Sequence, residues 1–209
     1  MFPSILSRKQ INLIEQFDFL KNYGFYLAGG TALAIQVGYR TSLDFDFYTK
    51  KSFDSKKLQR LLEKKFKKTI LLQKDEDTLI VKINDIAVSF FKYSYPLIFS
   101  LIKQGKFLPM ASKEDIAAMK IVAVSDRGAK RDFIDIYFLL QEFSLQKILS
   151  FVKKKYPNFN IYVALRGLTY FVDADKKQTR KLYLFYNVSW NKIKKFLIDE
   201  VKKYQKENL

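Results

Sequence analysis

The sequence predicts an α+β fold, in which a small mixed β-sheet flanked by helices is followed by a helical C-terminal region. Three observations predict it. A short strand, a glycine turn, an apolar helix and a second strand follow one another between residues 25 and 48. Three segments rich in β-branched residues lie between residues 69 and 92, and helical spacing of apolar residues dominates after residue 112. We expect a sheet-containing unit over residues 1–141, with a helical region over residues 142–209 packed on it.

The N-terminal elements are predicted from apolar spacing and glycine positions. From Ser7 to Leu20 apolar residues recur at helical intervals, which predicts an amphipathic helix. Phe25 to Ala28 is expected to be a short strand. The pair Gly29-Gly30 then forms a turn, and Thr31 to Val37 follows as a strongly apolar helix. The next strand is expected to cover Leu43 to Tyr48.

The middle of the chain is predicted to complete the sheet. A helix with lysines on its outer face carries Leu58, Leu61, Leu62 and Phe66 on its apolar face. Three strands are expected after it, at Thr69 to Leu72, Thr78 to Ile83 and Ile86 to Lys92. Asn84-Asp85 forms a two-residue hairpin turn between the last two strands. Pro96 and Pro109 are expected to bracket a short apolar helix and an extended stretch.

The remaining segments are predicted to be helical. Ser112 to Val124 is a helix in which Ser112 and Asp115 stand in capping-box relation. Gly128 interrupts it, and Asp132 to Leu140 forms a more buried second helix. From residue 144 onward the pattern stays helical, with breaks at Pro157 and at the charged run of residues 173–181.

Composition narrows the chemistry. The 209 residues include 38 Lys plus Arg against 21 Asp plus Glu, a formal net charge of +17, which favours contact with a polyanion such as RNA or DNA. Cysteine and histidine are both absent, which excludes disulfides, thiolate zinc sites and histidine-based catalysis. There is no signal-like N-terminus and no apolar run of about 18 residues that could span a bilayer. We therefore expect a soluble cytoplasmic protein that uses carboxylates, lysines, hydroxyls and hard metal ions.

Two aspartates form the most informative pattern in the sequence. Asp44 and Asp46 alternate with Leu43, Phe45 and Phe47, so both carboxylates project from one face of a strand. An edge strand with its polar face in water would give the same alternation. The almost wholly apolar helix before it instead favours a strand inside the sheet, where two close carboxylates would repel unless a cation joined them. Beside the N-terminus of a helix, which favours anions, this pair predicts a Mg²⁺ and nucleotide site.

The run LAGGTALAIQVGYRTSLDFDFYT resembles the signature of the nucleotidyltransferase AbiEii/AbiGii toxin family, which has the DNA polymerase β-like nucleotidyltransferase fold. Two later segments are similar to motifs of the same family. Asp115 and Lys120 fit its Asp-x4-Lys motif, and residues 130–136 fit its basic-Asp-apolar-apolar-Asp segment. The match runs in the right order over roughly Tyr26 to Leu140.

The resemblance implies the activity and the roles of the site residues. It implies a Mg²⁺-dependent nucleotidyltransferase that moves a nucleoside monophosphate from an NTP to an acceptor, with a tRNA 3′ end as the first candidate. It also implies that the protein is the toxin of a toxin–antitoxin or phage-defence pair and has a cognate antitoxin. Asp44 and Asp46 would be the Mg²⁺ ligands, and Lys120 would act on phosphate charge. Asp132 would complete the catalytic set, and the nucleotide-binding residues would be Gly29, Gly30, Thr31, Arg40 and Lys120. Such transfer requires little proton chemistry from side chains, so the lack of histidine is no obstacle.

One position departs from the wider fold. Many of its enzymes place a third metal-binding carboxylate on a later strand, where this sequence has Ser89, and Asp85 lies in the adjacent turn. Three alternatives remain open: a site completed by a remote acid such as Asp132, a weakly held second metal, or an inactive homologue. The sequence therefore also admits a non-catalytic nucleotide- or RNA-binding module, or an interaction domain for an acidic partner.

Several charged residues have competing interpretations. Arg40 either reaches a phosphate or neutralises the aspartate pair. Asp115 is expected to be a cap, and it should not share one small site with Lys120, because five residues place the two about 140° apart around a helix. Asp132 and Asp135 share a helical face, with Lys130 and Arg131 as possible ion-pair partners.

Four lysine clusters would suit the backbone of a structured RNA, although charge runs are usually solvated faces. They are Lys64 to Lys68, Lys153 to Lys155, Lys192 to Lys195 and Lys202 to Lys203.

Overall fold

The structure, a computed structural model, describes residues 2–103, 108–176 and 183–208. Within these residues one sheet is built from β1 (Tyr26–Ala28), β2 (Phe45–Thr49), β3 (Thr69–Asp75), β4 (Thr78–Ile83) and β5 (Ile86–Lys92). The strand order is β1-β2-β5-β4-β3. The pair β2–β5 is parallel and the other three pairs are antiparallel, so the predicted mixed sheet is confirmed. The aspartate strand β2 is an interior strand, as predicted.

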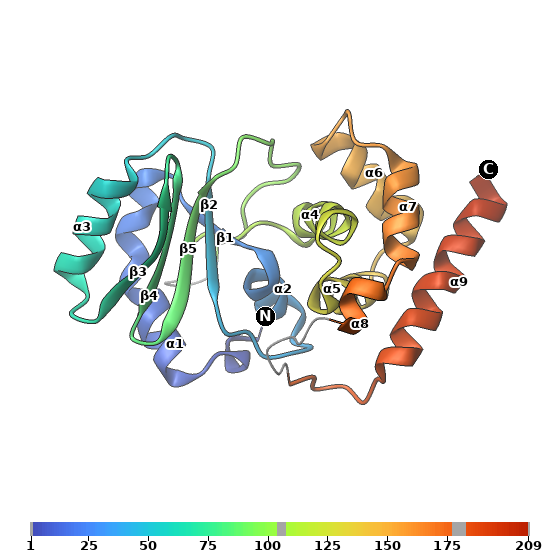
Figure 1. Cartoon of the computed structure of the whole chain (residues 1–209), viewed down its shortest axis with the longest axis horizontal. Coiled ribbons are helices and arrows are strands. Elements are labelled where there is room, and N and C mark those ends of the chain that lie inside the picture. Colours follow the sequence, from blue (N-terminus) through green and yellow to red (C-terminus); the bar gives the residue numbers. More distant parts are fainter. Residues whose placement is uncertain (1, 104–107, 177–182, 209) are drawn as a thin grey trace.

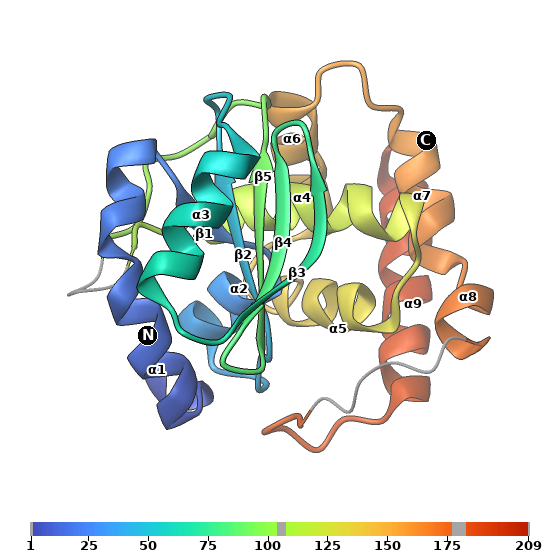
Figure 2. The same ribbon diagram turned by 60° about the vertical axis from the view of Figure 1, so that its left-hand side comes forward.

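One face of the sheet is covered by N-terminal helices and by α3 (Figures 1 and 2). After the short 3₁₀ turn η1 (Pro3–Ile5), the predicted first helix is an α-helix, α1 (Arg8–Ile14), that continues as the 3₁₀ segment η2 (Glu15–Tyr23). Phe17 of η2 packs edge-on against Phe47 and Phe90 of the sheet, with ring centroids 5.2 and 6.3 Å apart. The helix α3 (Ser55–Lys65) begins at the capping residue Asp54. The phenylalanines of β2 therefore bury one face of the strand and leave the aspartate face to the other side.

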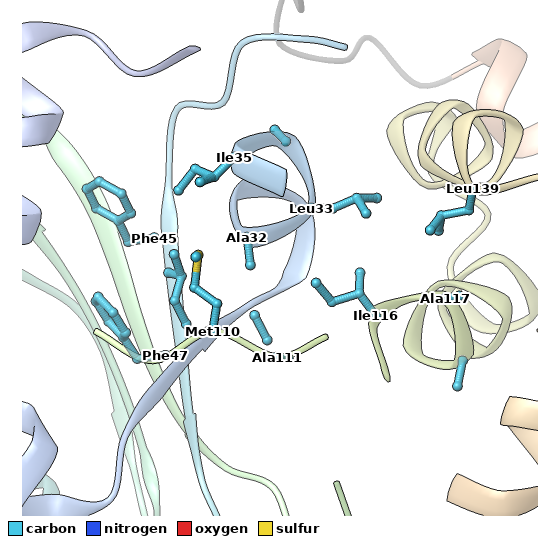
Figure 3. Packing of buried hydrophobic residues seen from close by; sticks show 14 of the residues in the cluster. Ala32, Leu33, Ile35, Phe45, Phe47, Met110, Ala111, Ile116, Ala117 and Leu139 are labelled. Atoms are coloured by element: carbon cyan, nitrogen blue, oxygen red, sulfur yellow. The ribbon is translucent and has the colours of Figure 1, made fainter. Parts of the chain in front are cut away.

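The second face is covered by α2 (Gly29–Val37) and then by the helical half of the molecule. Figure 3 shows α2 between Phe45 and Phe47 of the sheet and Ile116, Ala117 and Leu139 of two later helices. Residues 31–35 of α2 are buried. The predicted glycine turn is the first turn of this helix, and Gly29 has a φ of 66°, which glycine adopts without the strain a side chain brings. Because α2 is enclosed on both sides, its N-terminus is held rigidly beside β2.

The helical half consists of α4 (Lys113–Asp126), α5 (Lys130–Leu139), α6 (Leu145–Lys155), α7 (Ile161–Thr169), α8 (Val172–Lys176) and α9 (Trp190–Asn208). The helix α4 packs against α5, α6 and α7, and α9 packs against α5, α6 and α7. Breaks at Gly128 and Pro157 are confirmed. A division of the chain at residue 141 stays a prediction. No helix in the described ranges is long and apolar enough to cross a membrane.

Three local predictions need correction. Residues 95–103 form no helix, and Ile102 instead forms a single bridge with Met110, which in turn bridges Leu27. The two prolines and the bridge between Ile102 and Met110 favour an extended chain. Residues 173–176 of the charged run are helical in α8, whereas its end, 177–181, lies outside the described residues.

The third correction concerns the predicted capping box at α4. Ser112 does cap the helix, since its Oγ accepts a hydrogen bond from the amide of Asp115. The Asp115 carboxylate, however, accepts hydrogen bonds from the amides of Ile98 and Phe99 and forms a salt bridge with Lys155, the Nζ–Oδ1 distance being 2.7 Å. Both side chains of this ion pair are fully buried. Asp115 is thus a structural anchor that joins the loop before α4 to α6.

Replacing Asp115 should destabilise the protein more than replacing Lys155. Asp115→Ala should cost about 3–5 kcal/mol in the free energy of unfolding, because it leaves the Lys155 ammonium buried. Besides Asp115, the contacts of that ammonium are the carbonyl of Pro96 and the ring of Tyr93. Lys155→Met should cost less, because Asp115 keeps the two amides and the Ser112 hydroxyl.

Urea denaturation of both variants measures the two losses. The matched control is Glu142→Gln, which breaks the partly exposed pair with Lys113 and should cost under about 1 kcal/mol. Equal losses for Asp115→Ala and Lys155→Met would contradict the assignment of Asp115 as the better satisfied partner.

Candidate functional site

A cleft of about 890 Å³ lies between the aspartate face of the sheet and the helices α4 and α5. Almost all of the residues singled out in the sequence line it, namely Gly29, Gly30, Thr31, Arg40, Asp44, Asp46, Ser89 and Lys120. They come from segments up to about 90 residues apart. Their convergence is a result of the fold, and their roles remain predictions.

The two aspartates occupy different positions on the cleft floor. Asp46 lies within β2, opposite Ala28 of β1 and Ser89 of β5. Asp44 lies just before the strand, where its carbonyl accepts a hydrogen bond from the Thr31 hydroxyl. That hydroxyl is also 2.5 Å from the Ser42 hydroxyl. Thr31 therefore uses its side chain to fix the loop that carries Asp44.

The carboxylate of Asp46 is held in an unfavourable environment. Burial raises the pKa of Asp46, the Lys120 ammonium opposes that rise, and the Asp44 carboxylate adds to it. A side chain at Gly29 would bring its Cβ to 3.0 Å from Asp46 Oδ2, so glycine allows the helix start to approach the carboxylate. A half-buried carboxylate next to a second one is an environment that favours a bound cation.

Arg40 is buried and contacts Asp135 of α5. Its Nε donates to Asp135 Oδ1 at 2.8 Å and its Nη2 donates to Asp135 Oδ2 at 3.2 Å. Burial alone would lower the pKa of Arg40, but the Asp135 carboxylate raises it above its usual value. A Cβ at Gly30 would lie 2.3 Å from Arg40 Nη2, so the guanidinium lies directly against the first turn of α2. Its salt bridge is with Asp135, so phosphate binding and neutralisation of the aspartate pair both stay predictions.

Lys120 is oriented by two buried acids of α5. Its Nζ is 2.7 Å from Asp132 Oδ1 and 2.6 Å from Asp135 Oδ2. Asp132 also forms a bidentate salt bridge with Arg127, with Nε–Oδ2 and Nη2–Oδ1 distances of 2.8 and 2.9 Å. Burial would raise the pKa values of Asp132 and Asp135, but their cationic partners lower both below the usual carboxyl value.

These contacts revise the predicted pairing around α5. The cations bound to Asp132 and Asp135 come from other segments, namely Arg40, Lys120 and Arg127, whereas Lys130 lies over the ring of Trp190. Asp132 is fully buried and does not line the cleft. Its position makes it an orienting group for Lys120 and Arg127. Asp115 and Lys120 contact separate networks, as their angular separation predicted.

The structure adds cleft residues that the sequence did not assign to the site. Arg127, Arg131 and Asp126 line the helical wall, and Tyr48 and Phe91 lie on the sheet floor. The strand alternation contained a signal for Tyr48, because it is two residues beyond Asp46 and shares its face. No sequence pattern indicated that Arg127 would bind Asp132 across the break at Gly128.

The donor set on the cleft floor fits a hard divalent cation. Asp44 and Asp46 supply carboxylate oxygens, and Ser89, which stands opposite Asp46 in the sheet, helps to lower the pKa of Asp46. Among the described residues no cluster of three acids forms a metal site. Asp85 is exposed in the hairpin turn, where it pairs with Lys68 at 2.9 Å, so it does not substitute for the missing third carboxylate. The geometry thus offers two carboxylates and a hydroxyl.

The predicted lysine clusters are not equally available. Lys155 is buried with Asp115, so it is excluded from any RNA contact, and Lys194 binds Asp175 at 3.2 Å. Lys153 and Lys154 remain exposed on α6, as do Lys202 and Lys203 on α9.

Two solved structures described as nucleotidyltransferases have a similar fold. The chain superposes on a candidate nucleotidyltransferase of H. pylori with a TM-score of 0.54 at 20% identity, covering 97% of both chains. It also superposes on the nucleotidyltransferase toxin MenT4 of Mycobacterium tuberculosis H37Rv with a TM-score of 0.51 at 16% identity, covering 94% of this chain and 88% of that one. At these identities the likeness establishes the fold.

Sequence comparison gives the family. The family model described as "Nucleotidyl transferase AbiEii toxin, Type IV TA system" matches residues 16–107 and 92–204. The chain therefore belongs to the AbiEii nucleotidyltransferase toxin family and is a nucleotidyltransferase. An uncharacterized protein of Aquifex aeolicus (strain VF5) is 39% identical over 185 residues, which cover 86% of this chain and 87% of the relative.

Proposed function

We propose that this nucleotidyltransferase is Mg²⁺-dependent and moves a nucleoside monophosphate from an NTP to an RNA acceptor, with a tRNA 3′ end as the first candidate. The proposal rests on one observation. The same cleft is lined by the carboxylates of Asp44 and Asp46 from the sheet side and by the cationic side chains of Lys120 and Arg131 from the helices. Carboxylates on one side and cations on the other match the two charges of a metal-bound triphosphate.

Each wall of the cleft has a distinct task in this proposal. Asp44 and Asp46 would hold Mg²⁺, and the ion would supply positive charge that stabilises the reacting phosphate. The first turn of α2 offers its free backbone amides to phosphate oxygens, and Arg40 lies against that turn. Lys120, fixed by Asp132 and Asp135, presents one ammonium toward the same space. Because these groups are held before substrate arrives, little reorganisation is needed during transfer.

The identity of the acceptor rests on charge and on family membership. A net charge of +17 attracts a polyanion and makes binding salt-sensitive. The exposed lysines of α6 and α9 extend this charge over the helical half. Membership of a type IV toxin family supports a role as the toxin of a toxin–antitoxin pair. An acidic surface on the antitoxin would complement the same charge.

One observation favours a second candidate function. Ser89 stands opposite Asp46 where a third carboxylate would complete a two-metal site. A chain that binds NTP or RNA without transferring nucleotides would fit this feature.

Label transfer with metal removal separates these functions. The purified protein is incubated with Mg²⁺, total tRNA and each labelled NTP in turn. We expect label in RNA with one NTP or a few of them, loss of transfer with excess EDTA, and recovery when Mg²⁺ is restored. Transfer that persists in EDTA would contradict the metal role of the aspartates. Tight binding of NTP or RNA without label transfer would favour the binding homologue.

A further inference from the structure

The cleft continues beyond the carboxylates over a set of aromatic rings. Tyr48 follows Asp46 on β2 by two residues, and Phe91 pairs with Tyr48 from β5. Tyr93 lies just beyond β5, and all three rings line the cleft. Two residues along a strand correspond to about 7 Å, so the rings begin one side-chain spacing beyond the carboxylate. We call Tyr48, Phe91 and Tyr93 the aromatic floor.

Contacts with one another and with neighbouring tyrosines hold the rings of the aromatic floor in place. The Tyr48 ring centroid is 5.6 Å from that of Phe91 and 5.3 Å from that of Tyr93. Tyr26 of β1 stacks on Tyr48 with centroids 6.3 Å apart. The hydroxyl of Tyr93 hydrogen-bonds to that of Tyr156, which follows α6. The rings are therefore rigid, and none of the three is fully covered.

Partial exposure distinguishes these rings from the core. Phe45, Phe47 and Phe90 on the opposite face of the sheet are 0% exposed, whereas Tyr48, Phe91 and Tyr93 keep accessible surface in the cleft. Apolar rings left open beside a charged site favour a ligand with a flat neutral part and an anionic part. A nucleotide has both, because its base stacks on aromatic side chains while its phosphates need cations.

The wall that faces the floor carries polar groups. Asp126 and Arg127 lie at the C-terminal end of α4, line the same cleft and are exposed. A carboxylate accepts hydrogen bonds from the amino groups of bases, and a guanidinium donates to their carbonyl oxygens. A base on the floor would thus have partners for its edge as well as its face.

We propose that the aromatic floor is a nucleobase subsite of this nucleotidyltransferase, with Tyr48 and Phe91 stacking on the base. The inference rests on the proposed use of an NTP and an RNA acceptor in this cleft. The base belongs either to the donor NTP or to the terminal nucleotide of the RNA. Stacking is tolerant of base identity, so the subsite contributes affinity for nucleobases as a class.

Binding measurements with and without a base test the subsite. Calorimetry compares Mg²⁺–NTP with Mg²⁺–tripolyphosphate, which lacks base and sugar, and a separate titration uses a single-stranded RNA oligonucleotide. The variants are Tyr48→Leu and Phe91→Leu, which keep apolar bulk and remove the ring. Phe91→Tyr keeps a ring and should retain affinity. Tyr162→Leu on α7, whose ring is 64% exposed in a different groove, is the matched control.

We expect both leucine variants to lose about five- to tenfold or more in affinity for a nucleobase ligand, as base–aromatic stacking predicts. Tripolyphosphate affinity should stay the same in both variants. A loss confined to NTP assigns the subsite to the donor, and a loss confined to RNA assigns it to the acceptor. Unchanged affinity for both ligands, or an equal loss for tripolyphosphate, overturns the inference.

The outcomes also separate this inference from the proposed activity. If the unmodified protein binds NTP or RNA through these rings and transfers no label, the proposed activity is contradicted and the proposed subsite is supported. If transfer proceeds and the leucine variants bind as well as the unmodified protein, the subsite fails and the activity stands. If the unmodified protein binds neither NTP nor RNA, the subsite and the proposed activity are both overturned.

Discussion

Replacing Asp46 with asparagine should lower nucleotidyl transfer by about a thousandfold or more. A bound cation supplies several kcal/mol of charge stabilisation, and each loss of about 1.4 kcal/mol is tenfold in rate. Asparagine keeps the size of the side chain and can accept a hydrogen bond. The effect should therefore come from the lost charge. Single-turnover label transfer at saturating NTP and RNA measures it.

The same substitution should leave the metal-free protein as stable as before or more stable. The folded-state pKa of Asp46 is raised by burial, so its ionisation opposes folding. This contribution favours the fold at low pH and is lost as the pH rises through the folded-state pKa. Thermal melts in EDTA at neutral pH should show an unchanged or higher melting temperature for Asp46→Asn.

The control for this prediction is Asp85→Asn, because Asp85 is exposed in the hairpin turn and lies outside the cleft. It should change neither transfer nor melting temperature. If Asp46→Asn transfers nucleotides at the unmodified rate, Asp46 is not a metal ligand.

Replacing Asp135 with asparagine should cost about 3–5 kcal/mol in the free energy of unfolding, because it removes the anionic partner of two buried cations. Arg40 and Lys120 both bind the Asp135 carboxylate, and the Tyr39 hydroxyl donates to it. All four side chains are nearly or fully buried. A typical total stability is about 5–15 kcal/mol, so this variant should be marginal at physiological temperature.

Urea denaturation at neutral pH measures the loss, with Asp85→Asn again as the control. Acid should have a related effect. Because partners hold the pKa values of Asp132 and Asp135 below the usual 3.8, their contribution is present above that pH and is lost as the pH falls through the folded-state values. The unmodified protein should therefore lose this stabilisation only below about pH 4. An Asp135→Asn variant that unfolds at the unmodified urea concentration would show that the network contributes little to stability.

Local patterns predicted most of the fold. Alternation of Asp46 with phenylalanines placed its carboxylate on one face of an interior strand, as β2 confirms, whereas the predicted strand began too early and Asp44 lies just before it. Asn84 and Asp85 both adopt positive φ in the predicted two-residue turn, which their short polar side chains tolerate. These features depend on neighbours in sequence, so periodicity and turn chemistry were sufficient.

Long-range contacts decided what the sequence left open. Periodicity does not specify that Arg40 pairs with Asp135, 95 residues away, or that Asp115 faces Lys155 across two helices. Buried charges require partners, but many lysines compete for each carboxylate in so basic a chain. The described residues between Pro96 and Pro109, 97–103 and 108, do not form the expected short helix for a related reason, because pairing of Met110 with Leu27 and with Ile102 favours an extended chain.

The sequence by itself determined the glycine-led helix, the strand aspartates and the lack of histidine chemistry, because each depends on residue type and spacing over a few positions. Only the tertiary structure decided that Lys120 is held by two acids, that Ser89 faces Asp46 and that an aromatic floor extends the cleft. These depend on strand register and on how α4 packs over the sheet. Both are fixed by burial of the whole core, which no short stretch of sequence contains.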